Sequence, residues 1–436
     1  MELFESNTSP IDRGEKTVLV FVKFSKNKTD NDLLEFKELA NSSGVNTIKI
    51  FEVSYDKPNV KYLIGSGKVE EISEFISANN IEVVIFSQSL TPSQERNLEK
   101  KLSCRVIDKT SLILDIFALR AKSFEGKLQV ELAQLRHLST RLIRGWTHLE
   151  RQKGGIGLKG PGETQLETDR RLIGKRIKYL NNRLEKVDKQ RKSGRQARVK
   201  NRIPVISLVG YTNAGKSSLF NALTNTDTYV DNKLFATLDT TLRKVTLPAS
   251  GEVILADTVG FIKDLPHDLI AAFKSTLEET KKANLLLHVI DSSSSERDEN
   301  TTQVNKVLSQ ISADEVPLIT IMNKIDKLNG FKPRVDIDKD SNVKVWLSVK
   351  NNQGLDLLKR ELAKKLTGFF VLAKIKLKTN AGAIRSKIYK IGYIRKEKVN
   401  KLGEWLLEIM VTKHYLNLLL ANKNVRLLWE QNKKKK

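Results

Sequence analysis

Cysteine is almost absent from this 436-residue chain, which contains only Cys104. One cysteine cannot form an intrachain disulfide, and its scarcity fits a reducing compartment. Cys104 lies in an apolar stretch, where we expect a small core residue and not a reactive thiol.

Long apolar runs are also missing, since none approaches the ~18 residues that a helix needs to cross a bilayer. The first ten residues, MELFESNTSP, show no basic segment followed by an apolar one. We therefore expect a cytoplasmic protein without stable membrane insertion.

Acidic residues are scarce relative to basic ones. The chain has 76 Lys and Arg against 51 Asp and Glu, a net charge of +25. Such an excess favours a polyanionic partner such as nucleic acid, although a lysine-rich surface on an ordinary soluble protein is the alternative. The length predicts two to four domains, and the expected association state is a monomer.

The pattern of apolar and charged residues predicts an α/β fold. It also divides the chain into six consecutive segments. We predict a flexible N-terminus (1–15), an α/β domain (16–125), a basic antiparallel helical hairpin (126–202) with a glycine-rich tip (153–164), a domain that carries the chemical motifs (203–366), a small C-terminal α+β domain (367–432) and a basic tail (433–436).

The first α/β domain is predicted from apolar runs that alternate with amphipathic stretches, a pattern typical of a mainly parallel sheet. The expected strands are Val18–Phe24, Thr47–Val53, Ile81–Phe86 and Cys104–Ile107, and the expected helices are Asp32–Ala40, Lys68–Ala78 and Pro92–Leu102. Gly65 and Gly67 could cradle a phosphate, but such a pair more often marks a turn.

Two heptad-patterned stretches predict the hairpin, because each presents one apolar stripe that the other can bury. The stripes are Leu128, Leu132, Leu135 and Leu142, and Ile173, Ile177, Leu180, Leu184 and Val187. Thr164 and Glu167 have capping-box spacing at the start of the second helix. From Arg170 to Arg202 there are 14 Lys and Arg against 2 acidic residues, a net charge of +12. A solvated helix face usually mixes both signs, so we favour contact with nucleic acid.

The C-terminal segment predicts a strand, a helix, two strands and a second helix. Their expected ranges are Phe370–Leu377, Ala383–Tyr389, Gly392–Arg395, Glu404–Val411 and Tyr415–Ala421.

A phosphate-binding loop follows the strand Pro204–Val209, where GYTNAGKSS leads into the helical LFNAL. This is GxxxxGK[ST] in its strand–loop–helix context. Loop amides can converge on phosphate oxygens there, with Lys216 reaching the β- and γ-phosphates and the Ser217 hydroxyl ligating Mg²⁺.

Two further motifs complete a triphosphate and metal site. In EVILADTVG, Asp257 is expected to hold Mg²⁺ and the Gly260 amide to meet the γ-phosphate. The intervening LFATLDTTLR must supply a hydroxyl that closes over the metal, and Thr237, Thr240 and Thr241 are all eligible.

Guanine selectivity is predicted from NKID, where Asp326 can accept the N1–H and N2–H₂ donors that adenine lacks. Asn323 is expected to brace the loops and the Lys324 stem to lie along the base. Ser348-Val349-Lys350 follows another predicted strand and is placed to contact the guanine carbonyl through a backbone amide. All motifs in chain order indicate a GTPase.

At this point the sequence resembles the HflX family of ribosome-associated P-loop GTPases. The resemblance rests on YLIGSGKVEE, LILDIFALRA, EGKLQVELAQL, GGIGLKGPGETQLETDRRLI, GYTNAGKSSLFNAL, LFATLD, DTVGFIKDLPHDLIAAF and NKID. It implies that Thr237 is the switch threonine that ligates Mg²⁺. It also implies binding to the large ribosomal subunit and dissociation of stalled or stressed ribosomes, with the glycine-rich tip near the peptidyl-transferase centre. Thr240, Leu242 and Val349 depart from the family pattern and should tune the loops without abolishing binding.

The predicted site residues fall into four sets. GTP or GDP contacts are expected from Gly210, Tyr211, Thr212, Asn213, Ala214, Gly215, Lys216, Ser217, Ser218, Phe235, Ala236, Thr237, Leu238, Asp239, Asp257, Thr258, Val259, Gly260, Asn323, Lys324, Ile325, Asp326, Ser348, Val349 and Lys350. Catalytic contributions are expected from Lys216, Thr237 and Gly260, and Mg²⁺ ligation from Ser217, Thr237 and Asp257. Ribosomal RNA contacts are expected from Lys153, Gly154, Gly155, Lys159, Gly160, Gly162, Arg170 and Arg171.

Hydrolysis by the isolated chain is expected to be slow. Many GTPases place a glutamine after DxxG to orient the attacking water, whereas this chain has Phe261, which cannot form that hydrogen bond. We therefore expect the ribosome to stimulate turnover. The alternatives to ribosome dissociation are a factor in ribosomal subunit assembly and a switch that acts on a protein effector.

Overall fold

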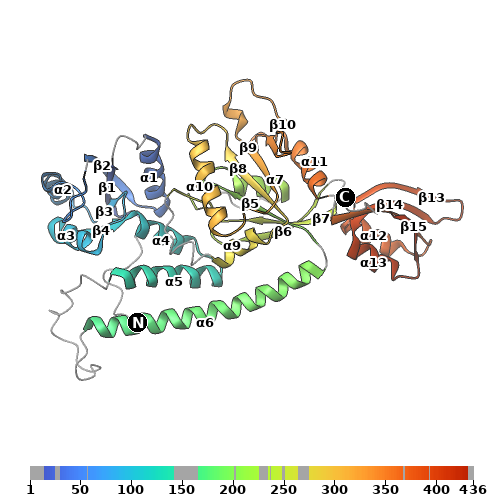
Figure 1. Cartoon of the computed structure of the whole chain (residues 1–436), viewed down its shortest axis with the longest axis horizontal. Coiled ribbons are helices and arrows are strands. Elements are labelled where there is room, and N and C mark those ends of the chain that lie inside the picture. Colours follow the sequence, from blue (N-terminus) through green and yellow to red (C-terminus); the bar gives the residue numbers. More distant parts are fainter. Residues whose placement is uncertain are drawn as a thin grey trace. The chain divides into compact units, whose positions relative to one another are not determined.

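The computed structural model describes most of the chain (Figure 1). The described residues are 14–24, 30–55, 57–141, 165–200, 203–224, 234–235, 237–247, 251–263, 274–366, 369–391 and 393–430. They form two compact units. Among the described residues, one unit comprises those from 14 to 187 with 234, 235, 237 and 238, and the other comprises those from 188 to 224, 239 to 263 and 274 to 430.

A parallel sheet forms the centre of the N-terminal domain, as predicted. Its strands run in the order β2-β1-β3-β4, and each pairs in parallel with its neighbour. The bounds are β1 Lys16–Phe24, β2 Asn46–Tyr55, β3 Val83–Phe86 and β4 Arg105–Asp108, with helices α1 Asp30–Ser43, α2 Ser66–Asn79, α3 Pro92–Leu102 and α4 Lys109–Arg120.

Three details of this domain add to the sequence interpretation. Helix α4 was not predicted, because its largely apolar sequence lacks the polar face of an amphipathic helix, and its residues from Leu112 to Phe117 are buried. Gly65 lies at the N-cap of α2, which agrees with the turn interpretation. Cys104 packs partly buried against the core, and burial raises the pKa of its thiol to about 12, so it stays protonated and unreactive.

Helices α5 (Phe124–Arg141) and α6 (Gln165–Lys200) pack through the predicted apolar stripes. Leu128 and Leu132 of α5 form one buried cluster with Leu180 of α6. Polar contacts fix their direction, because Arg183 lies over the Phe124 ring while Arg176 bonds to Glu131 further along. Residue numbers therefore rise along α5 as those of their partners fall along α6, so the two helices are antiparallel. The predicted tip 153–164, with Thr164 of the capping box, lies outside the described residues.

The motif-bearing domain contains a sheet in the order β10-β11-β9-β8-β5-β7-β6. Its inner strands are parallel, and β6 and β10 are antiparallel strands at the two edges. The bounds are β5 Val205–Gly210, β6 Thr241–Leu247, β7 Gly251–Asp257, β8 Leu285–Asp291, β9 Leu318–Asn323, β10 Arg334–Ile337 and β11 Val343–Trp346, with helices α7 Lys216–Thr224, α9 Lys274–Lys281, α10 Arg297–Gln310, α11 Leu355–Lys365 and the 3₁₀ turn η3 Ile325–Lys327. Parallel strands end at one edge of the sheet, so this topology brings the motifs after β5, β7, β9 and β11 together.

The C-terminal domain is an antiparallel sheet in the order β13-β14-β12-β15. Its elements are β12 Phe370–Leu377, α12 Gly382–Ile391, β13 Tyr393–Val399, β14 Trp405–Thr412, α13 Lys413–Leu420 and β15 Val425–Glu430. The sequence interpretation missed β15 and ended β13 too early at Arg395. Charged residues make up most of β13, and a register shift interrupts the pairing of β15 with β12, so neither strand shows the simple alternation of a half-buried strand.

Within the described residues, no helix is both long enough and apolar enough to span a membrane.

Candidate guanine-nucleotide site

The loop after β5 is shaped by two glycines that no other residue could replace without strain. Gly210 has φ +148°, and a Cβ there would lie 2.3 Å from the Val289 carbonyl oxygen. Gly215 has φ +96°, and its Cβ would lie 2.3 Å from Nδ2 of Asn323. The backbone therefore turns tightly between β5 and the N-terminus of α7, which is the strand–loop–helix arrangement of a phosphate-binding loop.

Lys216, the first residue of α7, is buried beneath this loop. Its Nζ donates a hydrogen bond to the Tyr211 carbonyl at 2.6 Å. Burial lowers the pKa of Lys216 to about 8, and the nearby Asp257 opposes this shift. A Cβ on Gly260 would lie 2.9 Å from Nζ and 3.1 Å from the Cα of Thr212, so a side chain at this position would crowd the lysine and the P-loop backbone.

Backbone hydrogen bonds connect DxxG to the P-loop. The Phe261 amide donates to the Gly210 carbonyl at 3.1 Å, and the Thr212 amide donates to the Phe261 carbonyl at 2.8 Å. The Phe261 side chain is buried and cannot orient a water molecule. Among the described residues, the buried Thr212 hydroxyl has no hydrogen-bond partner. An unpaired buried hydroxyl costs about 1–3 kcal/mol, which a polar ligand at the loop would offset.

Hard oxygen donors suitable for Mg²⁺ meet at the start of α7. The Ser217 hydroxyl donates to Oδ2 of the buried Asp257 at 2.8 Å. The described part of the chain contains no group of three or more His, Cys, Asp or Glu that could hold a metal. One hydroxyl and one carboxylate fit Mg²⁺, which keeps several waters and takes further oxygens from substrate phosphates.

The segment with the predicted switch threonine belongs to the N-terminal unit. The Leu234 amide donates to the Ser42 hydroxyl at 3.0 Å. The buried Phe235 ring packs edge-on against Phe117, with centroids 4.7 Å apart, and Phe235 has φ +56°. That conformation costs an L-residue roughly 1–2 kcal/mol, so packing must hold it. Ala236 lies outside the described residues, and the predicted nucleotide contacts of residues 235–239 remain predictions.

The other two eligible hydroxyls lie in the motif-bearing unit. Thr241 begins β6 and pairs directly with Asp257 of β7, and Thr240 precedes it. Which of Thr237, Thr240 and Thr241 ligates the metal therefore remains a prediction based on the family resemblance.

Asn323, at the end of β9, joins three loops of the predicted base site. Its side-chain amide donates to the Ala214 carbonyl at 2.9 Å and accepts from the Val349 amide at 3.1 Å. The expectation that Asn323 braces the loops is therefore confirmed.

Asp326 and Ser348 form a contact that sequence reasoning missed. The Ser348 hydroxyl donates to Oδ1 of Asp326 at 2.5 Å and accepts from the Asn351 amide at 3.2 Å. Sequence reasoning expected only a backbone contact to guanine near Ser348, since side chains 22 positions apart give no local signal. The Ser348 hydroxyl binds one oxygen of the Asp326 carboxylate and thereby fixes the orientation of that carboxylate.

Lys324 has φ +65°, and its ammonium group contacts Oδ2 of Asp291 at 2.8 Å. This ion pair holds the lysine stem near the loop after β8. The predicted contact of that stem with the base is compatible with this position and remains a prediction.

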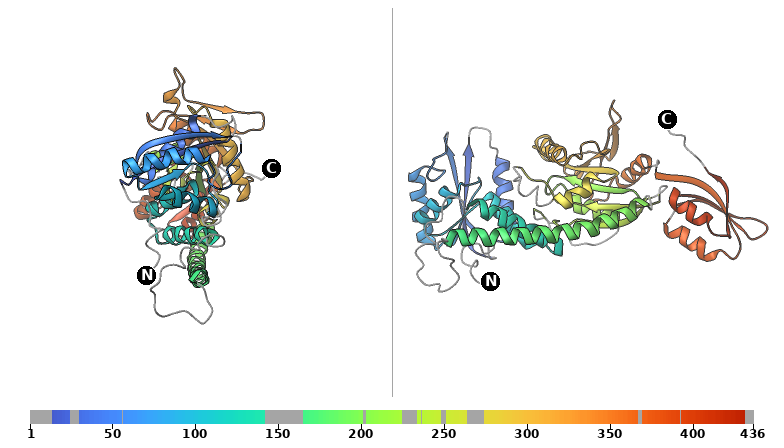
Figure 2. Two further views of the ribbon diagram at one scale, coloured as in Figure 1. Left: turned by 90° about the vertical axis from the view of Figure 1, so that its left-hand side faces the viewer. Right: turned by 60° about the horizontal axis from the view of Figure 1, so that its bottom comes forward.

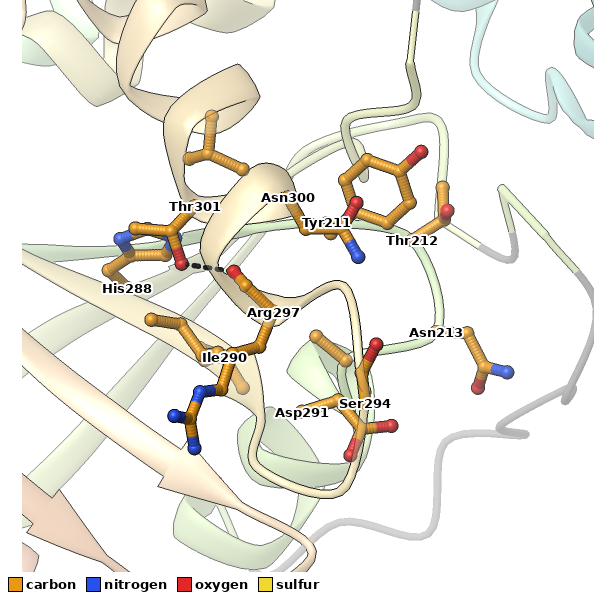
Figure 3. Close-up of a pocket in the computed structure, with 13 residues that line it drawn as sticks. Tyr211, Thr212, Asn213, His288, Ile290, Asp291, Ser294, Arg297, Asn300 and Thr301 are labelled. Carbon is orange, nitrogen blue, oxygen red and sulfur yellow. Dashed lines mark hydrogen bonds between the residues drawn. The ribbon is translucent and has the colours of Figure 1, made fainter. Parts of the chain in front are cut away.

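A small pocket lies between the P-loop and α10 (Figure 3). Its volume is about 160 Å³, and Tyr211, Asn213, His288, Asp291 and Asn300 are among its lining residues. Drug-sized ligands occupy about 300–1,000 Å³, so this pocket is too small for a whole nucleotide. Burial, followed by the nearby Lys216, lowers the pKa of His288 to about 4, so this imidazole is uncharged at neutral pH.

The predicted RNA contacts are only partly described. Lys153, Gly154, Gly155, Lys159, Gly160 and Gly162 lie outside the described residues, and Arg170 and Arg171 are exposed on α6.

Comparison with known proteins assigns these features to a family. The family described as "GTP-binding GTPase N-terminal" matches residues 30–118, "GTP-binding GTPase Middle Region" matches residues 120–198, and "50S ribosome-binding GTPase" matches residues 205–324. The GTPase HflX of Escherichia coli strain K12 is 52% identical over 399 residues, covering 91% of this chain and 94% of the relative. The chain belongs to the HflX family of GTPases. HflX of Caldanaerobacter subterraneus is 49% identical over 81% of each chain.

Two solved structures are more distantly similar to this chain. A crystal structure of SsGBP with GDP is 28% identical, with a TM-score of 0.48, over 81% of this chain and 99% of that one. A GTP-binding protein from Sulfolobus solfataricus in complex with GDP is 26% identical, with a TM-score of 0.45, over 81% and 99%.

Membership of the HflX family makes this chain a GTP hydrolase with a ribosome-binding type of GTPase domain. GTPases of this family generally use Mg²⁺, and Ser217 and Asp257 present oxygen atoms that suit it.

Proposed function

We propose that this GTPase binds the large ribosomal subunit in its GTP form and dissociates stalled or stressed ribosomes into subunits. Hydrolysis of GTP then releases it. The observation that carries this proposal is the exposed basic surface of helix α6, in a chain whose GTPase domain matches the ribosome-binding type. The alternatives, an assembly factor and a switch for a protein effector, would differ in what the protein binds.

In its described part, the solvent-facing side of helix α6 carries mainly basic residues, together with the apolar Leu172 and Tyr179. Ile173 and Leu180 are buried, while the basic residues Arg170, Arg171, Lys175, Lys178, Arg183, Lys186 and Lys189 are exposed. With a charge of +12 between Arg170 and Arg202, this face is suited to phosphate groups of ribosomal RNA. The predicted glycine-rich tip precedes the helix and would extend the contact.

The residues around the P-loop would each have a distinct role in GTP binding and hydrolysis. The loop amides and Lys216 would hold the β- and γ-phosphates, and the Gly260 amide would meet the γ-phosphate. Ser217, Asp257 and Thr237 would hold Mg²⁺, which supplies positive charge against the phosphate oxygens. Asp326, oriented by Ser348, would accept the guanine N–H donors and exclude adenine.

The anchored switch segment supports coupling between nucleotide and ribosome. Leu234 and Phe235 are fixed to Ser42 and Phe117 of the N-terminal domain, and Thr237 follows two positions later. Drawing Thr237 toward Mg²⁺ and the γ-phosphate would pull on that anchor. The N-terminal domain would thereby respond to GTP and relax after hydrolysis.

Slow intrinsic hydrolysis fits this cycle, because the GTP form must persist until a ribosome is met. Buried Phe261 offers no group for the attacking water. We expect the ribosome to supply or order that group, so turnover should rise when ribosomes are added.

Sucrose-gradient sedimentation tests the proposal. Intact ribosomes incubated with the protein and GTP, or a non-hydrolysable GTP analogue, should convert to subunits, whereas GDP and ATP should leave them intact. Co-sedimentation with precursor subunits alone would instead identify an assembly factor, and protein that stays at the top of the gradient would identify a switch for a protein effector.

Charge variants on α6 test the surface. Replacing the exposed Lys175 and Lys178 by Gln should weaken ribosome binding and make it less dependent on salt, by a slope of about 0.7–0.9 per charge removed. Replacing the exposed Lys306 and Lys339 of the GTPase domain by Gln is the matched control and should change neither the affinity nor its salt dependence. If the α6 variant and the control variant change ribosome binding equally, α6 is not the surface that contacts the ribosome.

A further inference from the structure

The C-terminal domain has a chain order and sheet order that leave one sheet face without helices. Its elements follow β12-α12-β13-β14-α13-β15, with strands arranged β13-β14-β12-β15. This is the split βαβ arrangement of ferredoxin-like domains. Ile388 of α12 and Leu416 of α13 share one buried cluster with Ile375 and Leu407 of the sheet, so both helices cover the same face (Figures 1 and 2).

Strand register identifies the residues on the opposite face. Residues directly opposite each other in antiparallel strands point to the same side, and neighbours along a strand point to opposite sides. Because Ile375 and Leu407 face the helices, the adjacent positions face away. They form two rows across the sheet, which are Lys396, Glu408, Lys374 and Trp429, and Lys398, Leu406, Lys376 and Arg426. One end of this face packs against the GTPase-domain core through Phe370 and Met410, and the two rows lie beyond it.

These rows, which we call the basic sheet face, are strongly positive. They contain five Lys and Arg and one Glu. Glu408 already contacts Arg395, and Lys376 contacts Glu404. Within the described residues, Lys374, Lys396, Lys398 and Arg426 form no ion pair. Lys376 lies directly opposite Arg426, and such a like-charge pair destabilises a sheet. Glu408 is the one acidic residue in the two rows, so it balances only part of their positive charge.

An aromatic residue lies within the same surface. Trp429, on the edge strand β15, has 48% of its surface exposed and lies opposite Lys374. Stacking an unpaired base on such a ring contributes about 1–3 kcal/mol, and neighbouring cations track the phosphates.

We propose that the basic sheet face binds single-stranded RNA, with Trp429 stacking on a base and Lys374, Lys398 and Arg426 contacting phosphates. An open four-stranded sheet with an exposed aromatic residue is a platform on which unpaired bases spread, whereas double-stranded RNA is contacted along its grooves. The charge excludes a basic partner, and the aromatic ring favours bases over an acidic peptide. This surface is separate from α6 and does not depend on the protein's action on ribosomes.

Fluorescence anisotropy with a labelled 12-nucleotide single-stranded RNA tests the proposal on the full chain. Trp429→Ala should weaken binding about 5- to 100-fold, whereas Trp429→Phe, which keeps a stacking ring, should recover most of the affinity. Lys398→Gln should weaken binding and lower the salt slope by about 0.7. Lys387→Gln, on the exposed side of α12, is the matched control and should bind like the unmodified protein.

GTP hydrolysis by each isolated variant should stay unchanged, which shows that folding is intact. Equal losses from Lys398→Gln and Lys387→Gln would overturn the proposal, as would unchanged binding by Trp429→Ala. A duplex of the same sequence that binds as tightly as the single strand would overturn it too. If the RNA-binding results come out as expected but the protein does not dissociate ribosomes, only the proposed function is contradicted.

Discussion

Replacing Asn323 by Ala should damage both stability and nucleotide binding. The side chain supplies one hydrogen bond to the Ala214 carbonyl and one from the Val349 amide, and it is buried. Removing it leaves two backbone groups unpaired, at about 1–3 kcal/mol each. Water that enters the space offsets part of the loss, so we expect the free energy of unfolding to fall by about 2–4 kcal/mol.

Nucleotide affinity should fall as well, because Asn323 aligns the P-loop with the base loops. A misalignment worth about 1.4 kcal/mol weakens binding tenfold, and we expect at least that much. Urea unfolding measures the stability and calorimetry with GDP measures the affinity. Asn305→Ala, at an exposed position of α10, is the control and should change stability by less than about 0.5 kcal/mol. An Asn323 variant that matches this control in both measurements would refute the reasoning.

Three further predictions concern the same site. Ser348→Ala frees the Asp326 carboxylate and removes a bond worth about 1.5–3 kcal/mol, so GDP affinity measured by calorimetry should fall about 10- to 100-fold. Gly215→Ala places a Cβ 2.3 Å from the Asn323 amide and should abolish GDP binding, whereas Gly174→Ala, which meets open space in α6, should raise stability by up to about 1 kcal/mol in urea unfolding. Because burial lowers the pKa of Lys216 to about 8, the unfolded chain binds more protons above that pH, and this group should make stability rise with pH between about 8 and 10.5. Bound phosphates favour the charged lysine, so calorimetry in buffers of different ionisation enthalpy should show proton uptake with GDP above pH 8, and its absence would contradict the assigned role of Lys216.

The GTPase-domain motifs were predictable because each is short and local. Gly210, Gly215 and Lys216 fall within one loop whose spacing alone indicates phosphate binding. The heptad stripes of α5 and α6 were equally local, and their contact followed from the need to bury both. The bracing role of Asn323 was predictable because the NKID pattern indicates a loop that must be fixed.

Features that depend on distant contacts could not be predicted in this way. The anchoring of Phe235 on Phe117 depends on how an earlier domain folds, and neither residue is distinctive in sequence. The bond between Ser348 and Asp326 exists only because β9 and β11 are neighbours in the sheet. The basic sheet face was hidden because β15 was missed, and its two rows appear only when four strands are in register.

A nucleotide-specificity switch tests the central claim that the base read by Asp326 controls ribosome dissociation. Asp326→Asn replaces one acceptor with a donor, which suits xanthine because a carbonyl stands where guanine has its N2 amino group. Sucrose gradients of intact ribosomes should show subunits for the unmodified protein with GTP only, and for the variant with xanthosine triphosphate only. Ribosomes that stay intact with the unmodified protein and GTP, or a variant that still requires GTP, would contradict the account.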